Sequence, residues 1–275
     1  MDDSPPDLIR RFGGTDRLYT APGAERLRSA HVAVVGIGGV GSWAAEALAR
    51  TGIGRLTLID LDHVAESNVN RQIHATSETL GMAKIAAMEQ RIASINPACP
   101  AMEQRIASIN PACQVSGIDA FVEPGNWPSI LPAGVDGVID ACDQMRAKVA
   151  MAAWALAQRD VLFITVGAAG GKRRPEALDI ADLSACVHDP LIAELRYQLR
   201  RNHGAAKEGK RIGLSCVYSP EPMTLPMAAE DAKMGMRHVD AGLNCRGYGS
   251  VVTVTATCGM LAAGWMLNKL SGVGK

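Results

Sequence analysis

The stretch HVAVVGIGGVG at residues 31–41 predicts a short buried strand that turns directly into a helix. The apolar run ends in Gly36, Gly38 and Gly41, which follow the spacing G-x-G-x-x-G. Glycines at this spacing let backbone N–H groups approach a phosphate or a ribose at the start of a helix. Taken alone, the turn indicates a dinucleotide such as NAD.

Strands and helices alternate after this turn. Further strands are expected at 55–60, 113–122, 134–143 and 161–171, with helices at 42–52, 79–97 and 146–159. The alternation predicts an α/β fold with a doubly wound, Rossmann-like and mostly parallel sheet, helices on both faces and an irregular C-terminal extension. We expect an N-terminal arm and helix over 1–30, a nucleotide-binding domain over 31–171, and a substrate-binding part of the same domain over 172–275.

The charge balance and the cysteines limit the class of protein. The 275 residues carry 28 Lys and Arg against 28 Asp and Glu, so a site for a polyanion has to be a local patch. None of the seven cysteines forms a C-x-x-C pair, which argues against a tetrathiolate zinc site. The acidic, proline-containing start MDDSPPDLIRR does not resemble a signal peptide, and we expect a cytoplasmic protein with reduced thiols.

Residues 247–268 form an uncharged stretch that is long enough to cross a bilayer. The stretch is rich in Thr, Gly and Ala and poor in Leu, Ile and Phe. A buried helix is therefore the preferred interpretation, with a membrane segment as the alternative.

A segment of 13 residues, AMEQRIASINPAC, occurs at 87–99 and again, unchanged, at 101–113. Solenoid repeats recur more often and diverge between copies, so two identical copies indicate a tandem duplication of one helix end. The crossover between two strands needs only one helix, and we expect the surplus copy to form a short extra helix.

Polar residues after the second strand distinguish between nucleotides. Asp60 ends that strand, where a carboxylate can accept both ribose hydroxyls of NAD or of ATP. Asn68, Arg71 and Gln72 follow, and Lys84 begins the next predicted helix. Hydride transfer needs no such cations, whereas attack on an α-phosphate does, because negative charge builds up on the transferring phosphate and on pyrophosphate. These residues favour ATP; the alternative is that Arg71 and Lys84 are ordinary surface charges.

Two acids at the end of a later strand predict a metal ligand. Asp140 and Asp143 lie in the segment GVDGVIDACD. Mg²⁺ prefers one or two carboxylates together with phosphate oxygens, so a strand end beside the nucleotide suits it. The alternative for Asp143 is a helix cap.

Together these motifs resemble the E1-like adenylating superfamily, which includes ThiF and MoeB. The resemblance rests on GIGGVGS at 36–42, LIDLD at 58–62, SNVNRQ at 67–72, Lys84 and DACD at 140–143. More closely, the chain is similar to the tRNA threonylcarbamoyladenosine dehydratase family at RFGGTDRLY (11–19), at 36–54 and at VNRQIHA (69–75). The likeness extends from about Arg10 to the C-terminus, interrupted by the duplication, and is most specific in the first half.

The resemblance implies ATP and Mg²⁺ as cofactors. Gly39 and Asp60 would contact the adenosine, and Asp143 would bind Mg²⁺. Around the phosphates the resemblance places Ser67, Asn68, Arg71 and Lys84.

Further positions and partners follow from the same resemblance. Arg17 would match an N-terminal arginine that reaches the ATP of a partner subunit, which implies a homodimer. Asp62 matches a second recurring acid, and Gln72 belongs to the nucleotide-binding motif. A protein partner of the sulfur-transfer type is also consistent with the superfamily.

The implied activity is an ATP-dependent, ligase-type dehydration of N6-threonylcarbamoyladenosine in tRNA. The carboxylate would be adenylated, a neighbouring atom of the modification would close a ring, and AMP would leave. The modified tRNA would bind the C-terminal part, with its phosphates on basic residues of 172–174 and 196–211; the alternative is a solvated charged face. For Cys245, beside an arginine and glycines, a structural role is favoured over a reactive thiol.

The main alternative activity is a ThiF/MoeB-like adenylyltransferase that activates the C-terminal glycine of a ubiquitin-like sulfur carrier. Many such enzymes carry paired zinc cysteines, which this sequence lacks. An NAD-dependent oxidoreductase and a non-catalytic nucleotide-binding scaffold are the remaining hypotheses. The full set of cationic and acidic positions argues against both.

Overall fold

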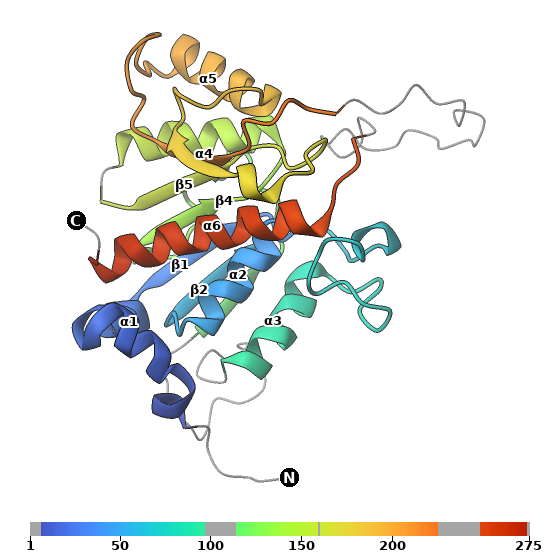
Figure 1. The fold of residues 1–275 in the computed structure, drawn as a ribbon, viewed down its shortest axis with the longest axis vertical. Coiled ribbons are helices and arrows are strands. Elements are labelled where there is room, and N and C mark those ends of the chain that lie inside the picture. The colour runs from blue at the N-terminus through green and yellow to red at the C-terminus, as the bar shows by residue number, and fades with distance from the viewer. Residues whose placement is uncertain (1–6, 97–113, 159, 225–247, 274–275) are drawn as a thin grey trace.

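A seven-stranded sheet runs through the centre of the computed structural model, which describes residues 7–96, 114–158, 160–224 and 248–273 (Figure 1). The strands are β1 (His31–Val35), β2 (Arg55–Ile59), β3 (Gln114–Ile118), β4 (Gly137–Asp140), β5 (Leu162–Val166), β6 (Asp179–Asp182) and β7 (Ser215–Tyr218). They lie in the order β3-β2-β1-β4-β5-β7-β6, and every neighbouring pair is parallel except β6 and β7. The predicted doubly wound, mostly parallel sheet is confirmed.

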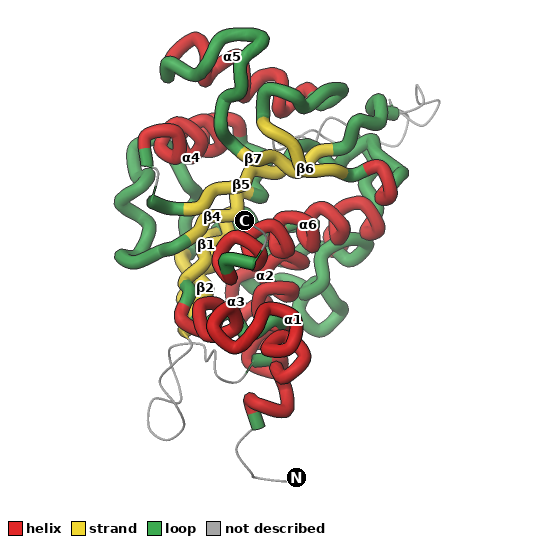
Figure 2. The backbone as a smooth tube through the Cα atoms, turned by 60° about the vertical axis from the view of Figure 1, so that its left-hand side comes forward, coloured by secondary structure: helices red, strands yellow, loops and turns green. Residues whose placement is uncertain are grey.

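Helices cover both faces of this sheet (Figure 2). They are α1 (Leu8–Ser29), α2 (Gly41–Arg50), α3 (Lys84–Ile95), α4 (Met145–Ala157), α5 (Pro190–Asn202) and α6 (Val252–Ser271), with short 3-10 helices η1 (Glu66–Asn68) and η2 (Pro175–Ala177). One face packs against α1, α2, α3 and α6, and the other against α4 and α5. Strand β1 is buried on both sides, with Val32 and Val34 facing the first layer and Ala33 and Val35 the second. This explains its continuous apolar run.

Helix α6 contains the uncharged stretch from Val252 onward. This helix lies beside α2 on the face of the sheet that also packs against α1 and α3 (Figure 1). Gly259 lets these two helices approach closely, because a Cβ there would lie only 2.9 Å from the backbone nitrogen of Ala44. The buried-helix interpretation is therefore confirmed. No helix among the described residues is long and apolar enough to cross a membrane.

The C-terminal third is more regular than its sequence suggests. Strand β7 extends the parallel sheet beside β5, β6 closes that edge as an antiparallel strand, and α5 covers the second face. Strands β6 and β7 have four residues each and are only partly buried, so they lack the continuous apolar run that marks the equally short but fully buried β4.

The duplicated segment is described only in part. Residues 87–95 of the first copy belong to α3, where Met88 and Ile92 are buried against the sheet. The first copy thus supplies the helix of the crossover from β2 to β3. Residues 97–113 lie outside the described residues, so the extra helix stays a prediction.

A buried ion pair joins the ends of β4 and β5. Lys148 on α4 and Asp140 at the end of β4 are inaccessible to solvent, and Lys148 Nζ lies 2.8 Å from Asp140 Oδ2. Lys148 Nζ also donates to Thr165 Oγ1 and Val166 O, each at 3.0 Å, and Thr165 Oγ1 donates to Asp140 Oδ2 at 2.6 Å. Burial acts to lower the pKa of Lys148, but the Asp140 carboxylate and other neighbouring groups together more than offset it, so the pKa is raised and the amine stays charged.

We predict that Lys148→Met lowers the free energy of unfolding by about 3–5 kcal/mol, because it leaves the Asp140 carboxylate buried without its cation. Urea denaturation measures the change. The double variant Asp140→Leu/Lys148→Met removes both charges and should be more stable than Lys148→Met alone. Arg28→Met is the control, since its partly exposed pair with Asp16 is worth less than about 1 kcal/mol. A similarly small loss in Lys148→Met would show that the pair does not hold the strand ends together.

Candidate active site at the carboxyl ends of the strands

A cleft of about 790 Å³ opens at the carboxyl ends of β1, β2, β4 and β5. The strand order reverses here, between β1 and β4, which is where doubly wound sheets bind their ligands. Three of the residues assigned to the nucleotide and metal site from the sequence, Gly41, Arg17 and Asp140, do not line the cleft. The others do: Gly36, Gly38, Gly39, Asp60, Asp62, Ser67, Asn68, Arg71, Gln72, Lys84 and Asp143.

The glycine turn forms one wall of the cleft. Gly36 has φ +84°, and a Cβ there would lie 2.9 Å from Ala141 O, so a larger residue would collide with the loop after β4. A Cβ at Gly41 would collide with the carbonyl oxygen of Gly36. Helix α2 begins at this turn without a capping side chain, and Ser42 N donates to Gly38 O at 3.1 Å, which leaves the other N–H groups of the first turn for an anion.

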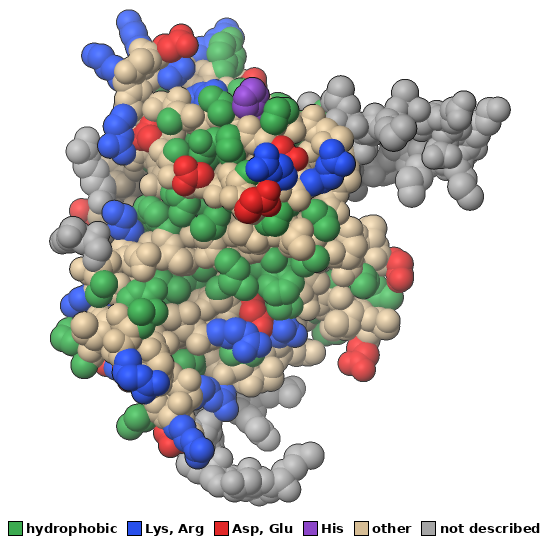
Figure 3. Space-filling model, in the orientation of Figure 1, with side chains coloured by type: hydrophobic (Ala, Val, Ile, Leu, Met, Phe, Trp, Pro, Cys, Tyr) green, Lys and Arg blue, Asp and Glu red, His purple; other side chains and the backbone are tan. Residues whose placement is uncertain are grey.

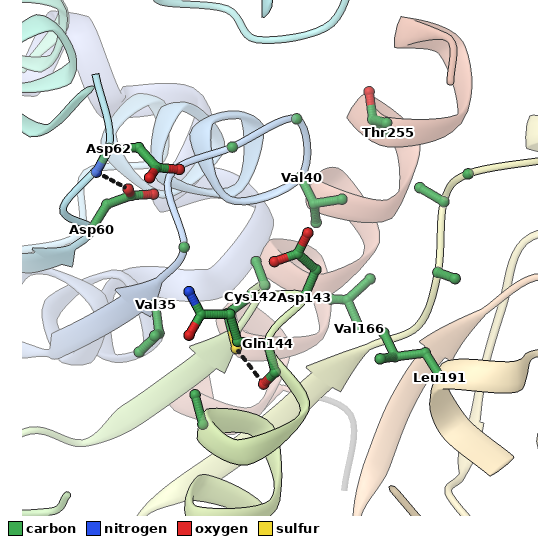
Figure 4. A pocket seen from close by; sticks show the side chains of 18 of the residues that line it. Val35, Val40, Asp60, Asp62, Cys142, Asp143, Gln144, Val166, Leu191 and Thr255 are labelled. Atoms are coloured by element: carbon green, nitrogen blue, oxygen red, sulfur yellow. Dashed lines mark hydrogen bonds between the residues drawn. The ribbon is translucent and has the colours of Figure 1, made fainter. Parts of the chain in front are cut away.

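The Asp60 carboxylate is buried at the end of β2 and accepts two backbone hydrogen bonds. Oδ2 accepts from Ile37 N at 2.6 Å, and Oδ1 accepts from Asp62 N at 2.8 Å (Figure 4). Burial raises the pKa of Asp60, while Lys84 and the two N–H groups offset part of this rise. The carboxylate is thereby fixed next to the glycine turn, with lone pairs left for donors such as ribose hydroxyls.

Lys84 supplies a buried cation beside this carboxylate. It begins α3, and its Nζ lies 2.6 Å from Asp62 Oδ2 and 3.9 Å from Asp60 Oδ1. Asp62, whose role the sequence leaves open, thus pairs with Lys84. The ammonium is held between two carboxylates, so its position in the cleft wall is set before any ligand binds.

The Arg71 side chain packs along the glycine turn. A Cβ at Gly39 would lie 3.1 Å from Arg71 Cγ, so the missing side chain leaves room for the arginine stem. Arg71 Nη1 donates to Ser67 O at 2.7 Å and to Asn70 Oδ1 at 3.0 Å. Burial lowers the pKa of Arg71, and the Asp143 carboxylate offsets this in part. Among the described residues the other guanidinium N–H groups have no partner, which leaves them for a ligand phosphate.

Asn68 and Gln72 support the loop that carries Arg71. Asn68 Oδ1 accepts from Ala65 N at 3.0 Å, which closes the short helix η1. Gln72 is buried behind Gly38, and its Oε1 has no partner among the described residues. A buried amide oxygen in this position fits a bound group that supplies a donor.

The two acids at the carboxyl end of β4 have different environments. Asp143 extends into the cleft toward Val40 (Figure 4) and has no hydrogen bond or ion pair within the described part of the chain. Asp140 is inaccessible to solvent and pairs with Lys148, so the prediction that Asp140 contributes to a magnesium site is wrong. Asp143 alone fits that role. In the described ranges no three His, Cys, Asp or Glu side chains cluster as a metal site.

Some of the basic residues predicted to contact tRNA are buried or half-buried, and the others are exposed. Lys172 is buried and donates to the backbone oxygens of His188, Ser219 and Glu221, so the prediction that it contacts tRNA is wrong. Arg196 is half-buried and donates to backbone oxygens of neighbouring residues. The basic residues that remain exposed are Arg173, Arg174, Arg201, Lys207, Lys210 and Arg211.

Neither Arg17 nor Cys245 is among the described residues that line the cleft. Arg17 is exposed on α1 and does not line the cleft of its own chain. Cys245 lies outside the described residues. Cys142 does line the cleft, but burial raises its thiol pKa well above the usual value, which makes it a poor nucleophile.

Apart from Asp143, the sequence motifs do not identify the half of the cleft that is formed by the loops after β4 and β5 with parts of α4, α5 and α6. Arg146, the second residue of α4, is a charged lining residue there. Apolar, aromatic and hydroxyl side chains complete this half: Met145, Val166, Leu191, Met223, Tyr248, Ser250 and Thr255. Arg146 could have been found from its position three residues after Asp143. The other lining residues of this half come from segments that contain no recognisable motif.

This arrangement suits chemistry at a phosphate. The glycine turn and the start of α2 offer N–H groups, Arg71 and Lys84 offer cations, and Asp143 offers a carboxylate. Donors and cations placed in this way stabilise the charge that develops on a phosphate and on its leaving group.

A profile of the ThiF family matches the chain at residues 15–101 and 99–275, so the two matches meet at the duplicated segment. The tRNA threonylcarbamoyladenosine dehydratase of Haemophilus influenzae is 40% identical over 263 residues, covering 95% of this chain and 93% of that protein. The protein of the same name from Escherichia coli is 40% identical over 266 residues, with the same coverage.

Solved structures show the same similarity. The crystal structure of E. coli tRNA N6-threonylcarbamoyladenosine dehydratase, TcdA, in complex with ATP has a TM-score of 0.81 and 39% identity, covering 97% of this chain and 96% of that chain. Its complex with AMP has a TM-score of 0.80 and 39% identity, covering 97% of both chains. The chain therefore belongs to the ThiF family and, within it, to the tRNA threonylcarbamoyladenosine dehydratases.

Proposed function

We propose that this protein catalyses the ATP-dependent dehydration of N6-threonylcarbamoyladenosine in tRNA, and that it does so in the cytoplasm. The observation that carries the proposal is the meeting of the glycine turn, Asp60, Arg71, Lys84 and Asp143 in one cleft. The relatives that bear this name align with nearly the whole chain. The complexes of E. coli TcdA with ATP and AMP contain the nucleotide that the proposed first step consumes and the nucleotide that the second step releases.

In this proposal ATP lies along the glycine turn. Asp60 accepts hydrogen bonds from the ribose, while the start of α2, Arg71 and Lys84 hold the phosphates. Asp143 fits Mg²⁺, because it is a carboxylate in the cleft that has no partner among the described residues, and the ion takes one or two carboxylates with phosphate oxygens. When bound there, Mg²⁺ would neutralise phosphate charge.

The reaction proceeds in two steps. A carboxylate oxygen of the threonyl group attacks the α-phosphorus, and the bond to pyrophosphate breaks. A nucleophilic atom of the same modification then attacks the acyl carbon, AMP leaves with the oxygen, and a proton is lost, so the nucleoside loses one water. The protein aligns the carboxylate with the phosphorus and stabilises the charge that moves onto pyrophosphate. No thiolate takes part, which agrees with the raised pKa of Cys142.

The tRNA approaches along α5. Leu191 in the first turn of this helix lines the cleft, and the last turn carries Arg200 and Arg201. Arg201 lies over the half-exposed ring of Tyr197, 5.7 Å from its centroid. Figure 3 shows Lys and Arg side chains gathered at the end of the molecule where α5 lies. A basic surface that leads to the cleft suits salt-sensitive binding of tRNA phosphates.

The protein acts as a homodimer in which Arg17 completes the site of the partner subunit. Arg17 is exposed on α1 and absent from its own cleft. Near it on the same helix, Ile9 is 81% and Leu18 is 72% exposed. Apolar side chains of this size beside an arginine fit a subunit interface that covers them.

The first test is mass spectrometry of nucleosides from tRNA that carries the modification. After incubation with this protein, ATP and Mg²⁺, we expect the modified nucleoside to lose the mass of one water, and only when ATP is present. AMP and pyrophosphate should form in equal amounts. Absence of this product, with pyrophosphate exchange that depends on a ubiquitin-like sulfur carrier, would replace the proposal with the alternative adenylyltransferase.

Arg71→Ala and Asp143→Ala should each lower kcat for dehydration by roughly 10²–10³-fold, or about 2.7–4 kcal/mol, because each removes a charged group beside the reacting phosphates. Circular dichroism should show that both variants are folded. The matched control is Arg50→Ala, which removes an exposed arginine paired with Glu46 outside the cleft and should leave turnover unchanged. Near-normal turnover in either cleft variant contradicts the assigned site.

Mixing two inactive variants tests the dimer. Arg17→Ala and Asp143→Ala should each be inactive alone, whereas an equal mixture after subunit exchange should regain about a quarter of wild-type activity. The reason is that a mixed dimer contains one site with an intact Asp143 and an intact Arg17 from the partner. If the mixture stays inactive although mass spectrometry detects mixed dimers, Arg17 does not act across the interface.

A further inference from the structure

The half of the cleft that faces β4 and β5 contains a cation with no role in the proposed nucleotide contacts. Asp60, Arg71 and Lys84 lie on the side of β1 and β2, where the glycine turn is. On the other side, the charged lining residues among those described are Asp143 and Arg146. Asp143 is the proposed magnesium ligand, so Arg146 is the cation left for a second ligand.

Arg146 is also free of partners inside the described part of the protein. It is exposed in the first turn of α4, and no hydrogen bond or ion pair joins it to a described residue. Opposite charges three residues apart on a helix often pair, but Asp143 precedes α4 and no ion pair with Arg146 forms. Both charges therefore face the cleft without neutralising each other through a direct contact.

The surroundings of Arg146 suit a ligand that is largely apolar and carries one anionic group. Leu191 and Val166 lie across the cleft from Asp143 (Figure 4), and Met145 and Tyr248 line the same half. Pockets for small ligands commonly combine apolar walls with a few polar groups that fix the orientation. A nucleobase bearing an amino-acid side arm has these properties.

We propose that Arg146 binds the carboxylate that is to be adenylated, an inference that rests on the proposed function. The carboxylate and the triphosphate are both anions, so their approach is opposed by charge repulsion. Arg71 and Lys84 offset this repulsion on the phosphate side, and Arg146 offsets it on the acyl side. One carboxylate oxygen accepts from the guanidinium, and the other stays free to attack the α-phosphorus.

Kinetics of Arg146→Gln test this role. We expect the KM for modified tRNA to rise by about tenfold or more, which is the loss of one hydrogen bond to a charged group, while the KM for ATP changes by less than about twofold. Arg146→Lys keeps the charge and should recover part of the affinity. Arg55→Gln, at the opposite end of the sheet and outside the cleft, is the control and should behave like wild type. An unchanged KM for modified tRNA in Arg146→Gln overturns the inference.

A tRNA phosphate is the other anion that a guanidinium could hold, and the free nucleoside separates the two. As inhibitors of the wild type, N6-threonylcarbamoyladenosine should bind about tenfold more tightly than its methyl ester, and Arg146→Gln should bind both equally. If Arg146 holds a phosphate instead, the variant loses affinity for modified and unmodified tRNA alike, and the ratio of acid to ester does not change. That result overturns the inference but leaves the proposed function intact. The proposed function itself fails only if the wild type does not dehydrate modified tRNA.

Discussion

The geometry of the cleft depends on the buried ion pair between Lys148 and Asp140. Lys148 Nζ also binds Val166 O, so the loops after β4 and β5 are tied to one amine and cannot move apart independently. Asp140 Oδ1 accepts from the backbone nitrogen of Cys142 at 3.3 Å, which extends the constraint to the residue before Asp143. Apolar residues often replace a buried ion pair without loss of stability, but they could not bind Val166 O and so would not tie these loops together. The position of Asp143 is therefore set by groups that lie beneath the cleft.

The charges in the cleft are arranged before any ligand binds. Lys84 is held by Asp62 and Asp60, and Arg71 is held by the oxygen of Ser67, so neither cation has to be ordered during the reaction. Preorganised charges of this kind lower a barrier more than mobile ones, because no reorganisation is needed as charge develops. Arg71 and Lys84 lie on the side of β1 and β2, and Arg146 lies on the side of β4 and β5. In the proposed reaction the cleft thus provides positive charge on both sides of a bond that forms between two anions.

The sequence predicts which residues meet in one half of the cleft, because that half is built from short local motifs at strand ends. The glycine turn follows β1 directly, and Asp60 follows β2, so spacing alone places them together. The sequence does not separate Asp140 from Asp143, because the difference depends on Lys148, which lies on the next helix and points into the core. The same limit applies to Lys172, whose buried partners lie 16 to 49 residues further along the chain. The sequence shows which residues are charged, whereas the groups that neutralise each charge are known only from the folded structure.

The first turns of α4 connect the core to the substrate side of the cleft. Residues 146 and 148 are two positions apart on a helix, which places their side chains about 200° apart around its axis. Arg146 can therefore line the cleft while Lys148 enters the core, although the two residues have the same charge. Because the ion pair with Asp140 fixes the rotation of α4, it also fixes the direction in which Arg146 points. The same buried contact therefore orients both Asp143 and Arg146, which keeps the proposed magnesium ligand and the proposed carboxylate-binding arginine in a constant relation to each other.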